Sequence, residues 1–242
     1  QPLADFSFSS PAICSNDTVF LNNLSSVKSP ASYRWSVTSP NPNGVIISDT
    51  TAFEPFLTFP LNQSTSDSTY TLLLVVTSAN GCKDSINQDI TVHRSPLVDF
   101  TITPEGCGPL DATVTNNTSN VSSTYVWNSS SLSPNAGLVT FTPDEFDPSP
   151  VVSFAANDSV DSIIYIIHLV ATSIDGCLDS LNREVVIYPN PTVDFTLSDT
   201  AGCQPLAIST ANISVPKSGE AIGTMSFSWY VNGLLYSNAQ DT

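Results

Sequence analysis

Basic residues are scarce in this 242-residue chain, which has 6 Lys and Arg against 22 Asp and Glu and a formal net charge of −16. Nucleic acids and anionic membrane surfaces are bound through basic patches, so this balance excludes both as expected partners. Charged residues make up only 12% of the chain, about half the share that is usual in globular domains. We therefore expect a weakly charged, acidic surface that neither binds nucleic acid nor inserts into membranes.

Long apolar runs and helical periodicity are also missing. The longest apolar run, Ile163–Ala171, contains His168 and is far shorter than the roughly 20 residues of a membrane-spanning helix. No segment repeats its apolar residues with the 3.6-residue period of a helix. Short runs of Val, Ile, Thr, Phe and Tyr, which favour strands, alternate with turns of Asn, Ser, Pro and Gly. The sequence predicts an all-β fold.

Catalytic and cofactor motifs are absent as well. The chain has 2 His, no Gly-x-Ser-x-Gly, and no histidine that a motif pairs with a serine or cysteine nucleophile. We expect no enzyme and no cofactor. Calcium is kept as an alternative, because Asp144-Glu145-x-Asp147 and Asp158–Asp161 each supply several oxygen ligands.

What the chain does contain is an internal repeat of about 95 residues. Residues 80–85 read Asn-Gly-Cys-Lys-Asp-Ser, and residues 175–180 read Asp-Gly-Cys-Leu-Asp-Ser. The other recurring landmarks are Asp-Phe at 5–6, 99–100 and 194–195, a cysteine at 14, 107 and 203, an aromatic-x-Trp at 33–35, 125–127 and 227–229, and a Tyr-led run at 70–78 and 165–173. We predict two whole repeats, 1–95 and 96–190, and the first half of a third at 191–242, so that the chain is a fragment of a longer array.

Each repeat predicts an immunoglobulin-like β-sandwich, because about seven short strands with a tryptophan in an early-middle strand are typical of that fold. The Asn-Gly and Asp-Gly pairs predict the F–G hairpin turn, since both residue types tolerate φ > 0. Stiff X-Pro linkers predict tandem sandwiches in a rod-like array. The expected core residues are Trp35, Trp127 and Trp229, with Tyr70 and Tyr165 at the start of strand F, and the expected G strands are Ile86–Val92 and Leu181–Ile187.

These landmarks resemble the PKD (polycystic kidney disease) domain, in the form of the PKD-like repeats of giant Bacteroidota cell-surface adhesins, such as those of gliding motility that the type IX system secretes. The matching motifs are Val-Asp-Phe, Gly-Cys-x-Pro-Leu, Tyr-x-Trp, the Tyr-led strand, Gly-Cys-x-Asp-Ser and the closing Pro-x-Pro. One departure is that Trp35 and Trp127 are followed by Ser-Val-Thr and Asn-Ser-Ser, where PKD domains carry Asp-Phe-Gly-Asp-Gly. A calcium role of that turn is therefore not carried over.

The resemblance implies an extracellular stalk on the bacterial cell surface, attached to the outer membrane through other regions, that extends a binding tip and bears force. Its partners would be the neighbouring repeats. Two alternatives stay open: the repeats bind glycans or surface polymers themselves, or they are spacers of a secreted hydrolase.

The resemblance also implies O-glycosylation, because Asp-Ser/Thr-aliphatic triplets match the acceptor motif of exported Bacteroidota proteins. The candidate acceptors are Thr18, Ser85, Ser159, Ser162 and Ser180. The alternative is that Asp-Ser pairs serve only as turn residues.

Cysteines at repeating positions in such a chain predict disulfides. Zinc is not expected, because His93 and His168 align with Tyr188 and Leu73 in the neighbouring repeat.

Two disulfide pairings are compatible with the repeat. The first closes each repeat, as Cys14–Cys82 and Cys107–Cys177. The second joins successive repeats through Cys14–Cys177, with Cys82, Cys107 and Cys203 finding partners outside the fragment. In an immunoglobulin-like sandwich the A–B and F–G ends lie more than ~20 Å apart, whereas bridged Cα atoms lie within ~7 Å. This favours the pairing between repeats, with free or mixed thiols as the remaining alternative.

Overall fold

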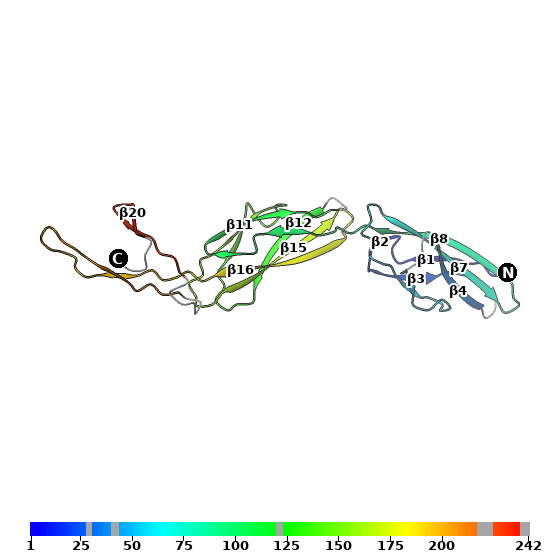
Figure 1. The fold of residues 1–242 in the computed structure, drawn as a ribbon. Coiled ribbons are helices and arrows are strands. Elements are labelled where there is room, and N and C mark those ends of the chain that lie inside the picture. The colour runs from blue at the N-terminus through cyan, green and yellow to red at the C-terminus, as the bar shows by residue number, and fades with distance from the viewer. Residues whose placement is uncertain (28–30, 40–43, 120–122, 217–224, 238–242) are drawn as a thin grey trace. The chain divides into compact units, whose positions relative to one another are not determined.

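The computed structural model describes residues 1–27, 31–39, 44–119, 123–216 and 225–237 (Figure 1). Every regular element in these ranges is a β-strand. Within the same ranges no helix has the length and apolar character needed to cross a membrane.

The chain forms two compact units that are discontinuous in sequence. Unit 1 consists of Gln1–Phe100, Asn116–Val126 and Leu169–Leu181. Unit 2 consists of Thr101–Thr115, Trp127–His168 and Asn182–Thr242. Because these units do not follow the sequence repeat, the boundaries 1–95, 96–190 and 191–242 remain a prediction.

The first repeat, which lies in unit 1, contains two four-stranded sheets of the orders β1-β3-β6-β5 and β2-β8-β7-β4. Strands β2 and β8 pair in parallel, whereas the other pairs of the two sheets are antiparallel. These are the A-B-E-D and A′-G-F-C orders of an immunoglobulin-like sandwich. The strands are β1 (Phe6–Phe8), β2 (Ala12–Cys14), β3 (Thr18–Asn23), β4 (Ala31–Ser39), β5 (Ile46–Ile47), β6 (Phe56–Thr58), β7 (Ser68–Ser78) and β8 (Lys83–His93).

The core of this sandwich is built from alternate residues of the facing strands, as a pleated strand requires. Leu72, Leu74 and Val76 of β7 are almost completely buried. Trp35 is 1% exposed and meets the Phe6 ring edge-on at 5.1 Å. Its indole N–H donates to the Ala52 carbonyl at 2.9 Å, so the buried polar group has a partner.

The second repeat has the same two strand orders, β9-β11-β14-β13 and β10-β16-β15-β12. Strand β10 pairs in parallel with β16, as β2 does with β8. Trp127 and Tyr165 are both almost completely buried. The strands are β9 (Phe100–Ile102), β10 (Glu105–Cys107), β11 (Leu110–Asn116), β12 (Ser123–Ser131), β13 (Val139–Thr142), β14 (Val151–Phe154), β15 (Ile163–Ser173) and β16 (Leu178–Tyr188).

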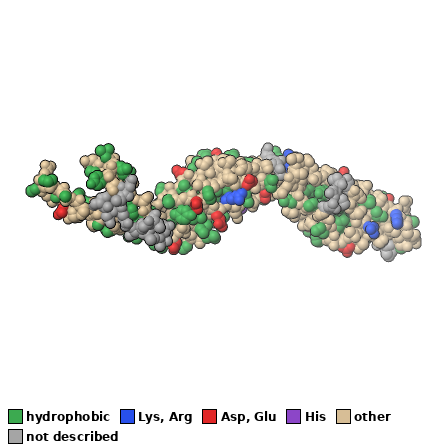
Figure 2. Space-filling view, viewed as in Figure 1, with side chains coloured by type: hydrophobic (Ala, Val, Ile, Leu, Met, Phe, Trp, Pro, Cys, Tyr) green, Lys and Arg blue, Asp and Glu red, His purple; other side chains and the backbone are tan. Residues whose placement is uncertain are grey.

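The described residues after 190 form two separate two-stranded sheets, β17 (Phe195–Leu197) with β18 (Thr210–Asn212), and β19 (Trp229–Val231) with β20 (Leu234–Ser237). Ser214 is the only buried residue among them, and large apolar side chains are exposed (Figure 2). Trp229 packs edge-on against Phe195 at 5.2 Å but stays half-buried. A two-stranded sheet lacks the second layer that buries Trp35 and Trp127, which explains the difference from the expected core position.

The repeated Asn-Gly-Cys and Asp-Gly-Cys segments form hairpin turns, as predicted, with positive φ at the glycine alone. Only the glycines, Gly81 at φ 81° and Gly176 at φ 83°, adopt positive φ. Gly81 N–H donates to the Ser78 carbonyl and Ser78 N–H to the Cys82 carbonyl, both at 2.9 Å. This is a type I turn followed by a glycine bulge. The residue before each glycine therefore does not need a left-handed conformation.

The aspartate of the same hexapeptide has a structural partner in both repeats. Asp84 Oδ2 accepts a hydrogen bond from the Ala4 backbone N–H at 2.7 Å. Asp179 Oδ2 accepts one from the Val98 backbone N–H at 2.9 Å. The carboxylate thus anchors the opening segment of its repeat to strand G, which gives a physical reason for the recurrence of this aspartate in the two hexapeptides.

A buried asparagine recurs before strand F in each repeat. The Asn157 side chain donates to the carbonyls of Asp161 at 2.9 Å and Ile187 at 2.8 Å, and its Oδ1 accepts from the Ser159 backbone and hydroxyl. Asn62 makes the corresponding bonds to Ser66, Val92 and Ser64. Each asparagine therefore ties the loop before strand F to the end of strand G.

Candidate functional site

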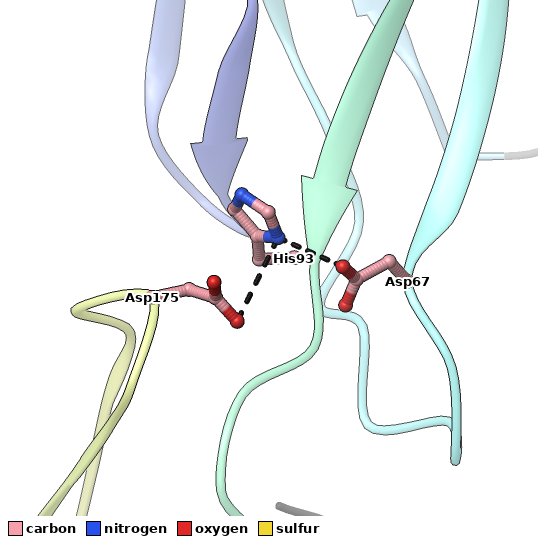
Figure 3. A group of neighbouring side chains, drawn as sticks. All are labelled: Asp67, His93 and Asp175. Carbon is pink, nitrogen blue, oxygen red and sulfur yellow. Dashed lines mark hydrogen bonds and ion pairs between the residues drawn. The ribbon is translucent and has the colours of Figure 1, made fainter.

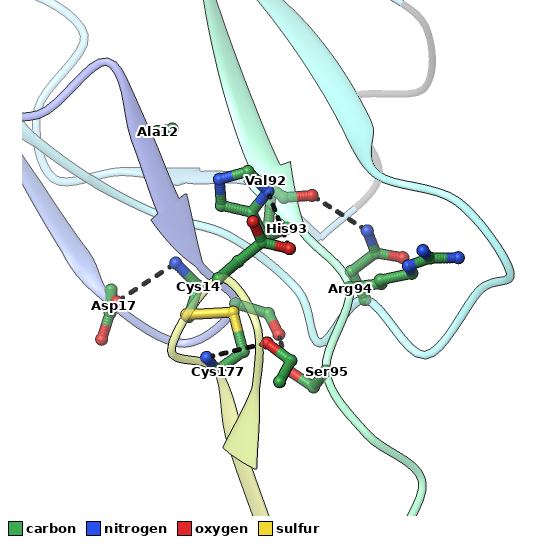
Figure 4. Close-up of a disulfide and its surroundings, with 12 residues drawn as sticks. Ala12, Cys14, Asp17, Val92, His93, Arg94, Ser95 and Cys177 are labelled. Atoms are coloured by element: carbon green, nitrogen blue, oxygen red, sulfur yellow. Dashed lines mark hydrogen bonds and ion pairs between the residues drawn. A yellow bond between two sulfur atoms is a disulfide. The ribbon is translucent and has the colours of Figure 1, made fainter. Parts of the chain in front are cut away.

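A disulfide joins Cys14, the last residue of β2, to Cys177 in the turn between β15 and β16 (Figure 4). The S–S distance is 2.11 Å, the Cα–Cα distance is 5.3 Å, and the two cysteines are 163 residues apart in sequence. Both lie in unit 1. The structure thus links the first repeat to the second rather than closing the first through Cys82. Cys82, Cys107 and Cys203 are free and exposed.

The groups around this disulfide are hydrogen-bonded. The Cys177 backbone N–H donates to Ser173 Oγ at 3.1 Å, and the Cys14 N–H is 3.3 Å from Asp17 Oδ2. The hydroxyls of Ser15 and Ser95, both buried, lie 3.1 Å apart. Cys177 itself is fully buried. The bond is therefore set in a packed, polar environment within unit 1.

An Asp-His-Asp cluster lies in the same unit (Figure 3), and its histidine is next to the disulfide (Figure 4). His93 ends β8 and pairs with Cys14 in the register of β2 and β8. Its Nδ1 is 2.9 Å from Asp67 Oδ2 and 3.8 Å from Asp175 Oδ2. Asp67 immediately precedes β7, and Asp175 comes from the turn that carries Cys177. The three ligand-type atoms lie within 4.8 Å of one another.

The charge of Asp67 is stabilised by its hydrogen bonds. The Arg94 backbone N–H donates to Asp67 Oδ1 at 3.1 Å, and His93 Nδ1 contacts the other carboxylate oxygen. The Arg94 bond first, and the His93 bond second, hold the pKa of Asp67 below its ordinary value. Asp67 is therefore a carboxylate at neutral pH, facing the His93 ring.

The sequence candidates for calcium do not form such a cluster. Asp144 Oδ1 accepts from the Phe146 backbone N–H at 2.9 Å, and Asp147 Oδ1 accepts from that of Ser149 at 2.8 Å. Both carboxylates thus stabilise local turns. In the part of the chain that the structure describes, Asp67, His93 and Asp175 are the one group of three such residues close enough to hold a metal ion. Sequence reasoning missed it because its members come from three distant positions.

The candidate O-glycosylation residues differ in accessibility. Thr18, Ser85 and Ser180 are exposed. Ser159 and Ser162 are half-buried, and the Ser159 hydroxyl bonds to Asn157 and to the Asp161 carbonyl at 2.6 and 2.7 Å. Modification of all five stays a prediction, and the three exposed residues are its better acceptors.

In the second repeat Tyr188 takes the place of His93, since it pairs with Cys107 as His93 pairs with Cys14. The Tyr188 hydroxyl donates to Glu105 Oε2 at 2.7 Å. This hydrogen bond, together with the negative charge of Glu105, raises the pKa of Tyr188 above its ordinary value of 10.0.

Ultraviolet titration of the phenol groups is expected to detect this shift. Because the folded-state pKa is raised, the Tyr188–Glu105 interaction favours the folded state below pH 10 and is lost as the pH rises through the folded pKa. Tyr188→Phe should remove one of the 7 tyrosine transitions, at the alkaline end. Glu105→Gln should move that transition back toward the ordinary value. A transition at the ordinary pKa in the parent protein would contradict the prediction.

Comparison with known proteins finds similarity at the level of the fold. No protein-family model and no curated protein matches the chain. The I67–I69 fragment from the titin I-band is 11% identical, with a TM-score of 0.41 over 98% of this chain and 82% of that one. The D00–D0 domain of intimin is 13% identical, with a TM-score of 0.37 over 76% and 99%. The protocadherin γB4 extracellular domain is 14% identical, with a TM-score of 0.30 over 85% and 35%.

The strand orders of the two repeats are those of an immunoglobulin-like sandwich. Both have an A-B-E-D sheet facing an A′-G-F-C sheet, with a parallel pair between the A′ and G strands. The prediction of an all-β fold of tandem immunoglobulin-like domains is confirmed.

Proposed function

We propose that this chain is a stalk segment of a bacterial cell-surface adhesin, built from PKD-like repeats that extend a binding tip and bear force. The observation that carries the proposal is the Cys14–Cys177 disulfide, which links one repeat of the sequence covalently to the next. A crosslink of this kind limits the freedom of two successive repeats and adds no chemistry of its own. It suits a structural role better than a catalytic one.

The disulfide also supports an extracellular location, because such bonds persist in oxidising compartments. Attachment to the outer membrane through other regions, export by the type IX system, a part in gliding motility and O-glycosylation belong to the same proposal through the sequence resemblance. The partners are neighbouring repeats of the same chain. No catalytic activity and no cofactor are part of this function.

Non-reducing peptide mapping of the secreted protein tests the proposal. We expect a linked peptide that contains Cys14 and Cys177, and alkylation of Cys82, Cys107 and Cys203 without prior reduction in the 242-residue chain. Reduction should split the linked peptide into two. A Cys14–Cys82 peptide would contradict the crosslink between repeats, and with it the proposed stalk.

One observation favours the alternative that the repeats bind glycans or surface polymers themselves. Phe20 and Phe56 form a cross-strand pair on β3 and β6 and are 58% and 41% exposed. Their ring centroids are 6.2 Å apart. The ring planes are inclined by 57°, however, so they do not form a flat stacking surface. A glycan array probed with this chain separates the two functions, since a stalk should bind no glycan.

A further inference from the structure

We propose that Asp67, His93 and Asp175 form a binding site for a zinc-like divalent transition metal, which would add a second link beside the Cys14–Cys177 disulfide. The site is independent of the proposed adhesin function, because it rests only on these three side chains. All three belong to unit 1.

The distances between the ligand atoms of the three side chains suit a metal ion of the size of Zn²⁺. Zinc binds histidine nitrogen and carboxylate oxygen at about 2.0–2.2 Å, so two ligands of a tetrahedral site lie roughly 3.4 Å apart. The distances from His93 Nδ1 to the carboxylate oxygens, 2.9 Å to Asp67 and 3.8 Å to Asp175, fall on either side of that value. Small side-chain rotations would therefore bring the three ligands to a common centre.

The ligand set selects the class of metal. One imidazole nitrogen with two carboxylate oxygens suits Zn²⁺ and its transition-metal neighbours, whereas Ca²⁺ takes only oxygen ligands and needs about six to eight of them. Asp67 and Asp175 are exposed, so water can complete the coordination. The acidic charge of the chain, −16, further favours a cation.

The position of the site gives the metal a structural effect. His93 and Asp67 flank the ends of β8 and β7 in the first repeat. Asp175 lies in the second repeat, two positions before Cys177, and its carboxylate points toward His93 (Figure 3). A bound ion would hold the turn that contains Asp175 to the end of β8 even if the disulfide were reduced. The corresponding positions of the second repeat are Ser162 and Tyr188, and Asp175 corresponds to Asn80, so the same ligand set does not recur within this chain.

Isothermal titration of the oxidised 242-residue chain with ZnCl₂ tests the site, after Cys82, Cys107 and Cys203 have been alkylated so that free thiols do not bind the metal. We expect one saturable Zn²⁺ site per chain. His93→Ala, Asp67→Asn and Asp175→Asn should each weaken it at least about tenfold. The unfolding temperature should rise with Zn²⁺ in the parent and not in these variants, because a ligand that binds only the folded state stabilises it.

The matched control is His168→Ala, which removes the other histidine of the chain, paired with Asn182 on exposed strand surface. This variant should bind Zn²⁺ like the parent, and CaCl₂ should produce no comparable saturable binding. Circular dichroism of each variant establishes that it is folded. The proposal is overturned if the parent binds no Zn²⁺, if His168→Ala weakens binding as much as His93→Ala, or if all three ligand variants bind like the parent.

Discussion

Pulling the oxidised chain from its two ends is expected to extend it by far less than its length allows, until the disulfide is reduced. The Cys14–Cys177 bond carries the force directly from one cysteine to the other, so the chain between them, a sequence separation of 163, is bypassed. A fully extended chain spans about 3.3–3.6 Å per residue, so reduction should release roughly 540–590 Å of additional length. Single-molecule force spectroscopy in the absence and presence of a reductant measures this difference.

The control for this measurement removes one cysteine at a time. Cys14→Ser should give the full extension without any reductant, because the crosslink can no longer form. Cys82→Ser should behave like the parent, since Cys82 is free and exposed in the structure. If the parent reached its full length before reduction, or if Cys82→Ser alone released the hidden length, the bond between repeats would be refuted.

The crosslink determines which segments of the proposed stalk carry the force. Most of the first two repeats lies inside the crosslinked loop, so the backbone between Cys14 and Cys177 cannot be pulled out until the S–S bond is broken. Peptide segments outside the loop, including β1 and β16, remain in the path of the force. The disulfide thus limits the extension that partial unfolding can produce, which is a useful property in a segment that has to keep a fixed length under load.

Much of this fold could be predicted from the sequence because each landmark residue occurs in both repeats. Tyr70 and Tyr165 lie two residues inside strands F, and the predicted G strands lie within the longer β8 and β16. The hairpin was found from Gly81 and Gly176, but its turn type was not, since Asn-Gly is compatible with more than one turn. The choice between them depends on the length and register of the flanking strands.

The residues that were not predicted from the sequence fall into two groups, those that occur in both repeats and those that occur once. The buried Asn62 and Asn157 were missed although a signal exists: each begins an Asn-x-Ser that follows Phe59 or Phe154 by three positions. The Asp-His-Asp cluster has no such signal. Its members lie at 67, 93 and 175, and only the folded chain brings them within 4.8 Å. Zinc was not expected from the sequence, because a metal ligand was assumed to recur in each repeat and neither histidine does. The Asp-His-Asp ligand set occurs only once, so that assumption does not apply to it.

Asn157→Ala is expected to destabilise the second repeat by about 3 kcal/mol. Asn157 is fully buried, and its amide supplies hydrogen bonds to the carbonyls of Asp161 and Ile187. Alanine would remove the donor to the buried Ile187 carbonyl and the acceptor of the Ser159 N–H and hydroxyl, at about 1–3 kcal/mol for each unsatisfied buried group, whereas the Asp161 carbonyl keeps its bond from the Ser159 hydroxyl. Hydrogen exchange of peptides from β15 and β16 measures the loss locally, as a roughly 150-fold fall in protection. Local measurement matters because a chain of several domains need not unfold in one transition.

Two further variants show whether the buried amide itself is responsible for the expected loss of stability. Asn128→Ala, at an exposed position of β12 in the same repeat, should change stability by no more than about 0.5 kcal/mol. Asn62→Ala should lower protection in β7 and β8 of the first repeat, because Asn62 makes the same bonds to Ser66 and Val92 there. If Asn157→Ala cost no more than Asn128→Ala, the loop before strand F would be held by packing alone. A loss of protection in the repeat that contains each substituted asparagine, and not in the other, would instead establish that each repeat is closed by its own asparagine.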